Sequence, residues 1–144
     1  MAVRIGPLTL DDYEAMLDLW RRAGLTNHTN LRDSRGSFAR QVRKNKGLYL
    51  GAFDRDRLVG TVLGTHDTRK GWINRLAVAP AYQHRGVGTR LLRTCERALV
   101  RKGMKVISAF VMEDNDPSLN LFRRSGYEPV PGAVHMRKKL EPDA

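Results

Sequence analysis

The stretch that decides the fold of this 144-residue chain reads Leu76-Ala77-Val78-Ala79-Pro80-Ala81-Tyr82-Gln83-His84-Arg85-Gly86-Val87-Gly88-Thr89. A strand-like apolar run ends at a proline, a short polar loop follows, and two spaced glycines lead into a helical pattern. The N–H groups in the first turn of a helix have no partner within the helix, and together with the helix dipole they attract anions. Gly86 and Gly88 lack a Cβ, so phosphate oxygens can approach the main chain, and Arg85 adds positive charge. The stretch therefore predicts a phosphate-binding turn between a strand and a helix.

Two common phosphate-binding motifs do not fit this turn. A dinucleotide fingerprint requires G-x-G-x-x-G, but its third glycine position holds Leu91. A P-loop requires Gly-Lys-Ser or Gly-Lys-Thr after four spacer residues, and the sequence contains none. Two spaced glycines alone would indicate only a tight turn. The preceding strand, Pro80 and Gln83 together favour phosphate binding.

Outward from this turn, the apolar periodicity predicts a mixed α/β fold in one domain that spans residues 1–144. The expected strands cover residues 3–7, 48–53, 58–64, 72–78, 106–111 and 134–140, and the expected helices cover 9–24, 34–44, 86–102 and a segment from Asp116 to just before Gly126. Strands joined by short turns should be antiparallel, whereas the two strands that flank the helix at 86–102 should be parallel.

The composition indicates a globular protein with anionic partners. Lys and Arg number 26 against 15 Asp and Glu, which gives a formal net charge of +11. Nucleic acid, an acidic membrane and a polyanionic cofactor would all suit this charge. The single cysteine, Cys95, excludes an intrachain disulfide and favours a reducing compartment. With no signal peptide or membrane-spanning run in the sequence, we expect a cytoplasmic location and no membrane partner.

The stretch at residues 76–89 reads Q-x-x-G-x-G after a strand ending in L-x-V-x-P. This pattern resembles the pyrophosphate-binding motif of the GNAT superfamily of acyl-CoA-dependent N-acetyltransferases. Members of that family often carry a second motif, N-x-x-A-x-x-L-Y-x-x-x-G-F, further along the chain, and a similar segment follows the expected strand at 106–111 here. At the matching positions this sequence has Asn115, Ser118, Leu121, Phe122, Gly126 and Tyr127.

The resemblance covers essentially the whole chain and implies the GNAT fold. In that fold a mixed, mostly antiparallel sheet is flanked by helices, and two central strands splay apart to admit pantetheine. It implies an N-acetyltransferase with acetyl-CoA as co-substrate and an amine as acceptor. The cofactor-binding positions that it implies are Leu76, Ala77, Val78, Gln83, His84, Arg85, Gly86, Val87, Gly88, Thr89, Asn115 and Phe122.

The resemblance also implies direct attack of the amine on the thioester in a ternary complex. An alkylammonium has a pKa near 10.4, so a base or a water chain must first remove a proton. The sequence departs from the family pattern because Phe122 stands where many relatives have a proton-donating tyrosine, and Phe110 where some have an acid. Asp67 and Glu113 are the candidate catalytic bases. Asp67 could equally be a turn residue, and Glu113 a solvated loop acid.

Relatives differ most at residues 26–46 and often bind their acceptors there. The sequence in this region crowds four polar residues between two helices, and we expect them to line an acceptor site: Asn27, Asn30, Arg32 and Asp33. Asp33 could receive a cationic amine. The alternative is that these residues cap helices and form turns.

Two other functions are compatible with the sequence. A GNAT-like protein could bind acyl-CoA without catalysis, given Phe122 and Phe110. A basic nucleic-acid-binding domain would suit the charge, but the basic residues are scattered and no ribonucleoprotein motif or zinc-ligand spacing accompanies them. We expect no metal and no acyl-cysteine intermediate, because Cys95 lies on the apolar face of its helix. Homodimers are common among relatives, and the identity of the acceptor is open.

Overall fold

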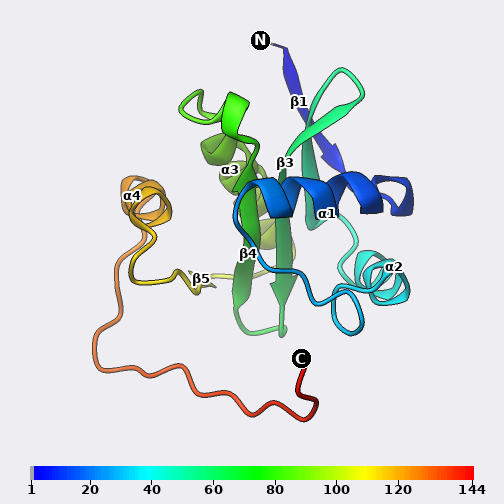
Figure 1. The fold of residues 1–144 in the computed structure, drawn as a ribbon. Helices are drawn as coiled ribbons and strands as arrows, with labels where there is room; N and C mark the ends of the chain where they lie inside the picture. Colours follow the sequence, from blue (N-terminus) through cyan, green and yellow to red (C-terminus); the bar gives the residue numbers. More distant parts are fainter. Residues whose placement is uncertain (1) are drawn as a thin grey trace.

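The computed structural model of the chain describes residues 2–144 and contains one five-stranded sheet (Figure 1). The strands follow one another across the sheet in chain order: β1 (Val3–Pro7), β2 (Tyr49–Asp54), β3 (Arg57–His66), β4 (Gly71–Val78) and β5 (Ile107–Ala109). Neighbours from β1 to β4 are antiparallel, and β4 and β5 are parallel. The predicted mixed, mostly antiparallel α/β sheet is confirmed.

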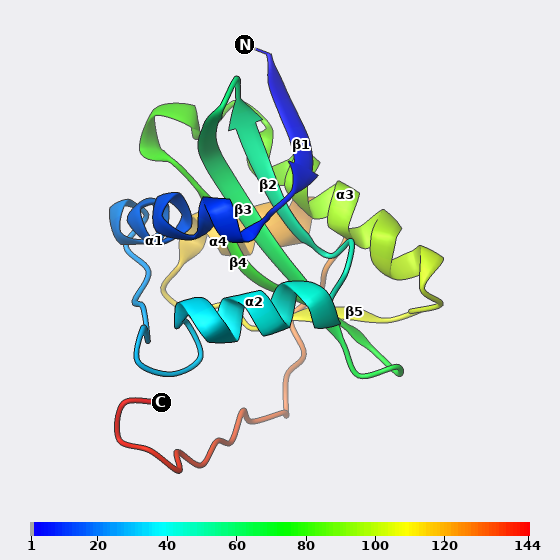
Figure 2. The same ribbon diagram turned by 90° about the vertical axis from the view of Figure 1, so that its right-hand side faces the viewer.

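Helices cover both faces of this sheet (Figures 1 and 2). The elements are the short 3₁₀ helix η1 (Leu10–Asp12), α1 (Tyr13–Arg22), α2 (Arg35–Lys44), the 3₁₀ helix η2 (Pro80–Tyr82), α3 (Val87–Arg101) and α4 (Asp116–Arg124). α1 and α2 lie on one face and α3 crosses the other. A Cβ added to Gly64 would lie 2.5 Å from the Sγ of Cys95, so glycine at this position lets α3 pack close to β3.

A buried polar link joins α1 to the middle of the sheet. The indole Nε1 of Trp20 donates to the Oγ1 of the fully buried Thr61 at 3.0 Å, and that hydroxyl donates to the main-chain oxygen of Arg75 at 2.9 Å. The register between β3 and β4 shifts between Thr61 and Leu63, which makes a bulge in β4. Arg75 lies in this bulge with φ at 51°, a left-handed conformation that non-glycine residues rarely adopt.

β4 and the edge strand β5 separate beyond this bulge. β4 pairs with β5 only where Gly71, Trp72 and Ile73 face Ile107, Ser108 and Ala109. The remainder of β4, from residue 74 to residue 78, has β3 as its neighbour on one side and no strand on the other within the described chain. The splay between two strands that the resemblance implied is therefore present, between β4 and the edge strand β5.

The predicted last strand, residues 134–140, is wrong. Residues 134–139 have no regular secondary structure, and Val134, Met136 and Leu140 are 81%, 86% and 84% exposed. A strand needs a hydrogen-bonding neighbour, and β5 has only three residues to pair with. The apolar residues of the tail alternate as they do in a strand, but the neighbouring strand β5 is too short to pair with the tail along its length.

One strand boundary also differs from the prediction. β5 is shorter than residues 106–111, since Val106 and Phe110 lie outside the strand and are 51% and 64% exposed. α4 begins at Asp116 as predicted, and its cap is Asn115, whose side chain accepts a hydrogen bond from the Ser118 N–H at 3.2 Å. Within residues 2–144, no helix is both long and apolar enough to cross a membrane.

Candidate active site

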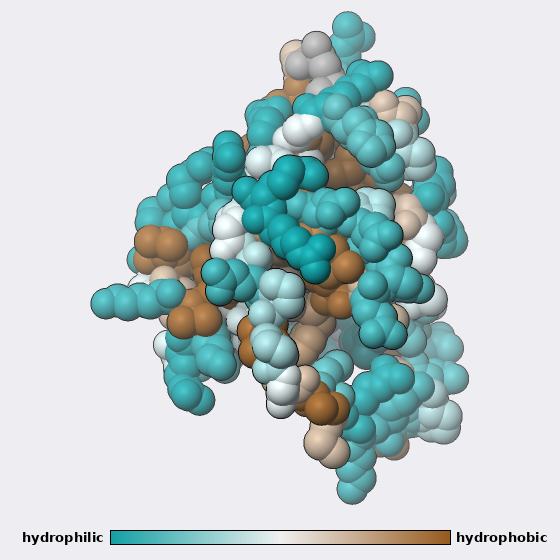
Figure 3. Space-filling view, turned by 90° about the vertical axis from the view of Figure 1, so that its left-hand side faces the viewer, coloured by the Kyte–Doolittle hydropathy of each residue, from teal (hydrophilic) through white to brown (hydrophobic). Residues whose placement is uncertain are grey.

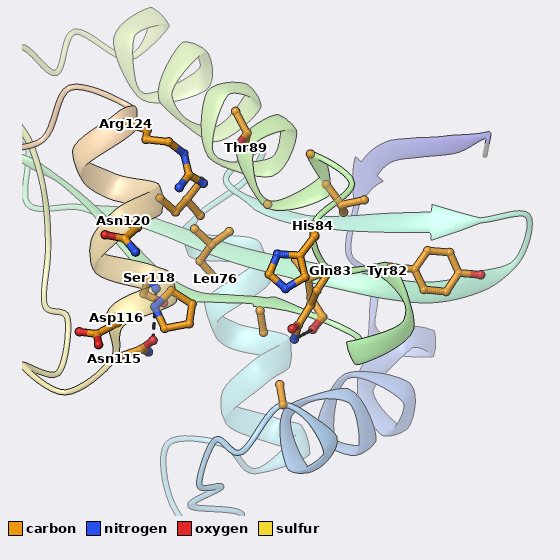
Figure 4. Close-up of a pocket in the computed structure, with 18 of the residues that line it drawn as sticks. Leu76, Tyr82, Gln83, His84, Thr89, Asn115, Asp116, Ser118, Asn120 and Arg124 are labelled. Atoms are coloured by element: carbon orange, nitrogen blue, oxygen red, sulfur yellow. Dashed lines mark hydrogen bonds between the residues drawn. The ribbon is translucent and has the colours of Figure 1, made fainter.

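A cleft of about 740 Å³ opens where β4 and β5 separate. Its walls are the end of β4, the turn into α3, the first residues of α3 and one side of α4 (Figure 4). The lining residues are Ala23, Leu25, Leu76, Ala77, Val78, Tyr82, Gln83, His84, Gly86, Val87, Gly88, Thr89, Asn115, Asp116, Pro117, Ser118, Asn120, Leu121 and Arg124. In the space-filling view of this side, apolar surface shows between hydrophilic side chains (Figure 3).

The turn before α3 presents main-chain N–H groups to the cleft. Gly86 is the N-cap of α3 with φ at 80°, and no side chain caps this helix. The first-turn N–H groups are therefore left for a ligand, and the positive end of the helix dipole coincides with them. The Gln83 side chain holds the turn in place by donating to the main-chain oxygen of Val78 at 3.0 Å. This arrangement presents main-chain donors that can bind an anion.

α4 forms the opposite wall of the cleft. Its first turn is fixed by the Asn115 cap, and its side chains Asn120 and Arg124 lie one turn apart on the lining face. Figure 4 shows Arg124 extending from α4 toward α3. Leu121 packs near the start of α3, because a Cβ on Gly88 would lie 3.4 Å from its Cδ2. Gly88 thus keeps the two helices close, and Arg124 adds a guanidinium to the lining of the same cleft.

The structure brings together most of the residues that the sequence assigned to the cofactor. All of them line the cleft except Arg85 and Phe122. The Arg85 guanidinium lies over the ring of Tyr82, 5.8 Å from its centroid. Phe122 is 8% exposed and packs edge-to-face on Tyr127, with ring centroids 5.0 Å apart, so it belongs to the core.

Within residues 2–144, Tyr82 is the only tyrosine in the cleft lining, and neither it nor Tyr127 presents its hydroxyl there in place of Phe122. Tyr127 does not line the cleft, and its hydroxyl donates to the Oε2 of Glu96 at 2.6 Å. Burial, together with that carboxylate, raises the pKa of Tyr127 well above its ordinary value. Tyr82 lines the cleft, but its ring turns away from it (Figure 4) and its hydroxyl donates to Asp54 at 2.5 Å. Both phenols are therefore occupied elsewhere.

Neither candidate base lies in the cleft lining. Asp67 is in the turn between β3 and β4, at the far end of β4 from the cleft, and accepts the N–H groups of Arg69 and Lys70 at 2.9 and 2.7 Å. These hydrogen bonds hold the pKa of Asp67 below its ordinary value, which weakens it as a base. Glu113 is an exposed residue in the loop before α4. The geometry supports the turn and loop interpretations of these two acids.

The four expected acceptor residues lie outside the cleft lining as well: Asn27, Asn30, Arg32 and Asp33. Asp33 accepts the His28 N–H at 2.7 Å, and its carboxylate lies 3.6 Å from the Arg75 guanidinium. Its side chain is only 11% exposed. Asn27 donates to the main-chain oxygen of Leu17 at 3.4 Å, while its buried Oδ1 has no partner within residues 2–144. Asp33 therefore anchors the loop between α1 and α2 to the β4 bulge.

Several lining residues escaped the sequence analysis. Asn120 and Arg124 follow the start of α4 at four-residue intervals, so helical periodicity from the Asn115 cap could have placed them on the cleft face. Ala23 and Leu25 come from the end of α1, and no local signal in the sequence relates them to β4. Cys95 is fully buried, and burial raises the pKa of its thiol to about 12, so it remains protonated and shielded.

Comparisons with known proteins agree with this geometry. In the solved structures, similar folds occur in the PaiA N-acetyltransferase of Thermoplasma acidophilum in complex with coenzyme A (20% identity, TM-score 0.77, covering 89% of this chain and 91% of that one). They also occur in the ribosomal-protein-S18-alanine N-acetyltransferase of Escherichia coli (20% identity, TM-score 0.71, 87% and 77%). An aminoglycoside acetyltransferase from an uncultured soil metagenomic sample is similar over 98% of this chain and 100% of its own length (18% identity, TM-score 0.74).

These likenesses establish the fold, and a match in sequence establishes the family. The match extends over residues 13–127, from the start of α1 through the turn that follows α4, and so includes both motifs and the whole cleft. The chain belongs to the acetyltransferase (GNAT) family.

Proposed function

We propose that this protein transfers an acetyl group from acetyl-CoA to a primary amine by direct attack within a ternary complex. The amine nitrogen bonds to the thioester carbon, the carbon–sulfur bond breaks, and coenzyme A leaves as the thiolate. The proton lost from nitrogen balances the charge of that thiolate. The observation that carries the proposal is the uncapped N-terminus of α3 opening into the cleft between β4 and β5.

The phosphates of the donor would bind at the turn before α3. Main-chain N–H groups after Gly86 supply directed donors, and Arg124 supplies a cation from the other wall. The coenzyme A in the Thermoplasma structure supports this choice of ligand, since that protein shares the fold. An anion site with donors on two helices suits the pyrophosphate of coenzyme A better than a single phosphate.

The pantetheine arm would lie along the part of β4 that has no partner on the β5 side. Leu76, Ala77 and Val78 line the cleft there, and their main chain lies next to the bulge at Arg75. A main-chain N–H in this segment can stabilise the oxyanion that forms at the thioester carbon. The bulge is held from behind by Thr61 and Asp33, so the donors are fixed before the ligand arrives.

We assign proton removal to water rather than to a side chain. Asp67 and Glu113 lie outside the lining, and position 122 is a buried phenylalanine. Proximity in the ternary complex supplies the larger part of the acceleration in this scheme. The rate should then rise with pH as the acceptor amine deprotonates, up to an amine pKa near 10.4.

Thermal unfolding with and without acetyl-CoA tests the proposal. Ligand at 100 times its dissociation constant stabilises a protein by ~2.7 kcal/mol, which is a rise of roughly 5–10 °C for a domain of this size. In the Gly86→Glu variant the added carboxylate should repel the phosphates and remove the shift. Gly47→Glu is the matched control, because Gly47 also has a positive φ with open space around it but does not line the cleft.

Release of coenzyme A in the presence of a panel of amines then separates catalysis from binding. Acetyl-CoA binding that needs Gly86, together with thiol release, would support the transferase. Binding without release for any amine would favour the non-catalytic alternative. No thermal shift at millimolar acetyl-CoA would contradict the proposal altogether.

A further inference from the structure

A second hollow lies at the opposite edge of the sheet from the cleft. It measures about 560 Å³ and is lined by Val3, Arg4 and Ile5 of β1 and by Arg90, Arg93 and Arg97 of α3, with Thr94 between them. Figure 2 shows β1 at the edge of the sheet with α3 crossing behind it. Three strands separate β1 from β5, so this hollow is a different surface from the candidate active site.

β1 has one hydrogen-bonding edge that faces outward. The Leu8 N–H donates to the Tyr49 oxygen at 2.9 Å, and the register continues this antiparallel ladder back to Val3. Hydrogen-bonding direction alternates along such a strand, so the main-chain groups of Val3 and Ile5 point away from β2. Within residues 2–144, β1 has no neighbour other than β2. These donors and acceptors have no strand partner in the described part of the chain, although Val3 is only 6% exposed and Ile5 is partly exposed.

The arginines of α3 form a row beside that edge. Arg90, Arg93 and Arg97 are exposed and lie three and four residues apart, which places them on one side of the helix. None of them forms an ion pair with a carboxylate in the part of the chain that the structure describes. Like charges at this spacing repel one another, and a row of carboxylates would relieve that repulsion.

The geometry points to an extended acidic segment of a partner protein, which we propose adds to β1 as a further strand. Its main chain would pair with Val3 and Ile5, and alternate carboxylates would reach the α3 arginines. The row spans roughly 10 Å along α3 at 1.5 Å per residue, and side chains on one face of a strand repeat about every 7 Å, so two or three acidic residues would cover it.

Two other occupants fit this surface less well. A phosphodiester backbone only accepts hydrogen bonds, so it would leave the outward carbonyl groups of Val3 and Ile5 unpaired. The exposed tail of a second copy carries Arg137, Lys138 and Lys139, whose charge would oppose the arginines. A peptide with acidic side chains satisfies both the donors and the acceptors of the edge and complements the charge.

Binding of a labelled peptide, acetyl-Val-Glu-Val-Glu-Val-Glu-Thr-amide, tests this inference by fluorescence anisotropy. We expect the dissociation constant to rise at least tenfold in Arg93→Glu/Arg97→Glu and when lysine replaces glutamate in the peptide. The Lys138→Glu/Lys139→Glu variant changes the net charge equally at the exposed tail and should bind normally. All variants should keep their thermal shift with acetyl-CoA, which makes this test independent of the proposed reaction.

A separate experiment tests the main-chain pairing at β1 independently of the α3 arginines. Ile5→Pro removes an outward N–H and should weaken binding at least tenfold. Should that variant fail to fold, hydrogen exchange of the unmodified protein gives the same information, since the peptide should slow exchange at the Val3 and Ile5 amides at least tenfold.

Three outcomes would overturn the inference. One is the absence of peptide binding at millimolar concentration. Another is peptide binding that leaves hydrogen exchange at the β1 amides unchanged and that is weakened no more by the Arg93/Arg97 variant than by the Lys138/Lys139 variant. The third is preferential binding of a single-stranded oligothymidine that requires the arginines but leaves exchange at β1 unchanged, which would make the surface a nucleic-acid site.

Discussion

Arg75 is held in a left-handed conformation by contacts on three sides. Thr61 donates to its carbonyl oxygen, its guanidinium lies 4.7 Å from the centre of the Trp20 ring, and Asp33 lies 3.6 Å away. A residue in such a region of backbone space costs on the order of 1–3 kcal/mol and persists only when its surroundings fix it. Burial lowers the pKa of Arg75 while the Asp33 carboxylate opposes that change. The strain lies next to the segment that we propose binds pantetheine.

Replacing Asp33 by asparagine should expose the dependence of the bulge on this pair. The guanidinium would keep its charge in a half-buried place without its carboxylate, and we expect the free energy of unfolding to fall by about 1–3 kcal/mol. Asp18→Asn is the control, since Asp18 pairs with Arg21 and Arg22 on the surface and should cost less than about 1 kcal/mol. Urea denaturation measures both. An equal decrease in the free energy of unfolding in both variants would show that the pair between Asp33 and Arg75 stabilises the bulge no more than a surface ion pair would.

Buried thiol and phenol groups predict a loss of stability at alkaline pH. Burial raises the pKa of Cys95 from about 9 to about 12, and that of Tyr49 from 10 to about 12. Because these pKa values are raised on folding, the stabilisation is complete below the unfolded values and is lost as the pH rises toward 12. Between pH 10 and 11, Cys95 should lower the free energy of unfolding by ~1.4 kcal/mol per pH unit, because its thiol is then almost fully ionised in the unfolded chain. Urea titrations of Cys95→Ala should lose this slope, and an unchanged slope would exclude the thiol as its source.

At the scale of elements, Asn115 links the stability of α4 to the shape of the cleft. Removing its cap in Asn115→Ala should destabilise the protein by about 0.5–2 kcal/mol, whereas Asn115→Ser keeps a capping oxygen and should cost less. Thermal unfolding measures the cap, and the shift with acetyl-CoA measures the cleft. A serine variant with normal stability but a reduced shift would mean that the amide itself contacts the ligand. Equal stability of the two variants would contradict the capping role.

The elements that the sequence predicted correctly carry strong local signals. The β2–β3 hairpin follows from two apolar runs around a charged turn, and the start of α3 follows from Gly86. The missed features depend on contacts distant in sequence. Asp33 pairs with Arg75, which lies 42 positions further along the chain (75 − 33), and no periodicity in the sequence predicts that pair. β5 and the tail failed for the same reason, since pairing partners decide whether an apolar run becomes a strand.

The residues of the candidate site also fall into those that the sequence could predict and those that it could not. We propose that the turn from Gln83 to Thr89 binds the cofactor through its main chain, so the geometry of this turn follows from the glycine positions and was predictable. Asp67 and Glu113 lie outside the cleft lining, and their spacing in the sequence alone could not show this. The cleft at one edge of the sheet and the arginine row at the other appear only when the molecule is assembled.

For the whole molecule, we expect the C-terminal tail to be separable from the folded body. Its contacts are the His135 ring stacked on Phe110 with centroids 4.3 Å apart, and the Asp143 oxygen 2.9 Å from the Nδ1 of His28. Trypsin should cleave first at the exposed residues 137–139. The remaining body should keep its melting temperature within about 2 °C, because exposed residues contribute little. Mass spectrometry locates the cut, and a fall of more than about 5 °C would show that the tail stabilises the sheet.

The burial of Cys95 has a practical consequence for experiments in solution. It is the single cysteine in the sequence, and its side chain is fully shielded beneath α3. A cysteine introduced at an exposed position, such as Asn120 at the cleft or Lys138 in the tail, would therefore be the one thiol that a maleimide dye or spin label reaches. A pair of such labels would report the distance between the cleft and the tail without any change to the native core.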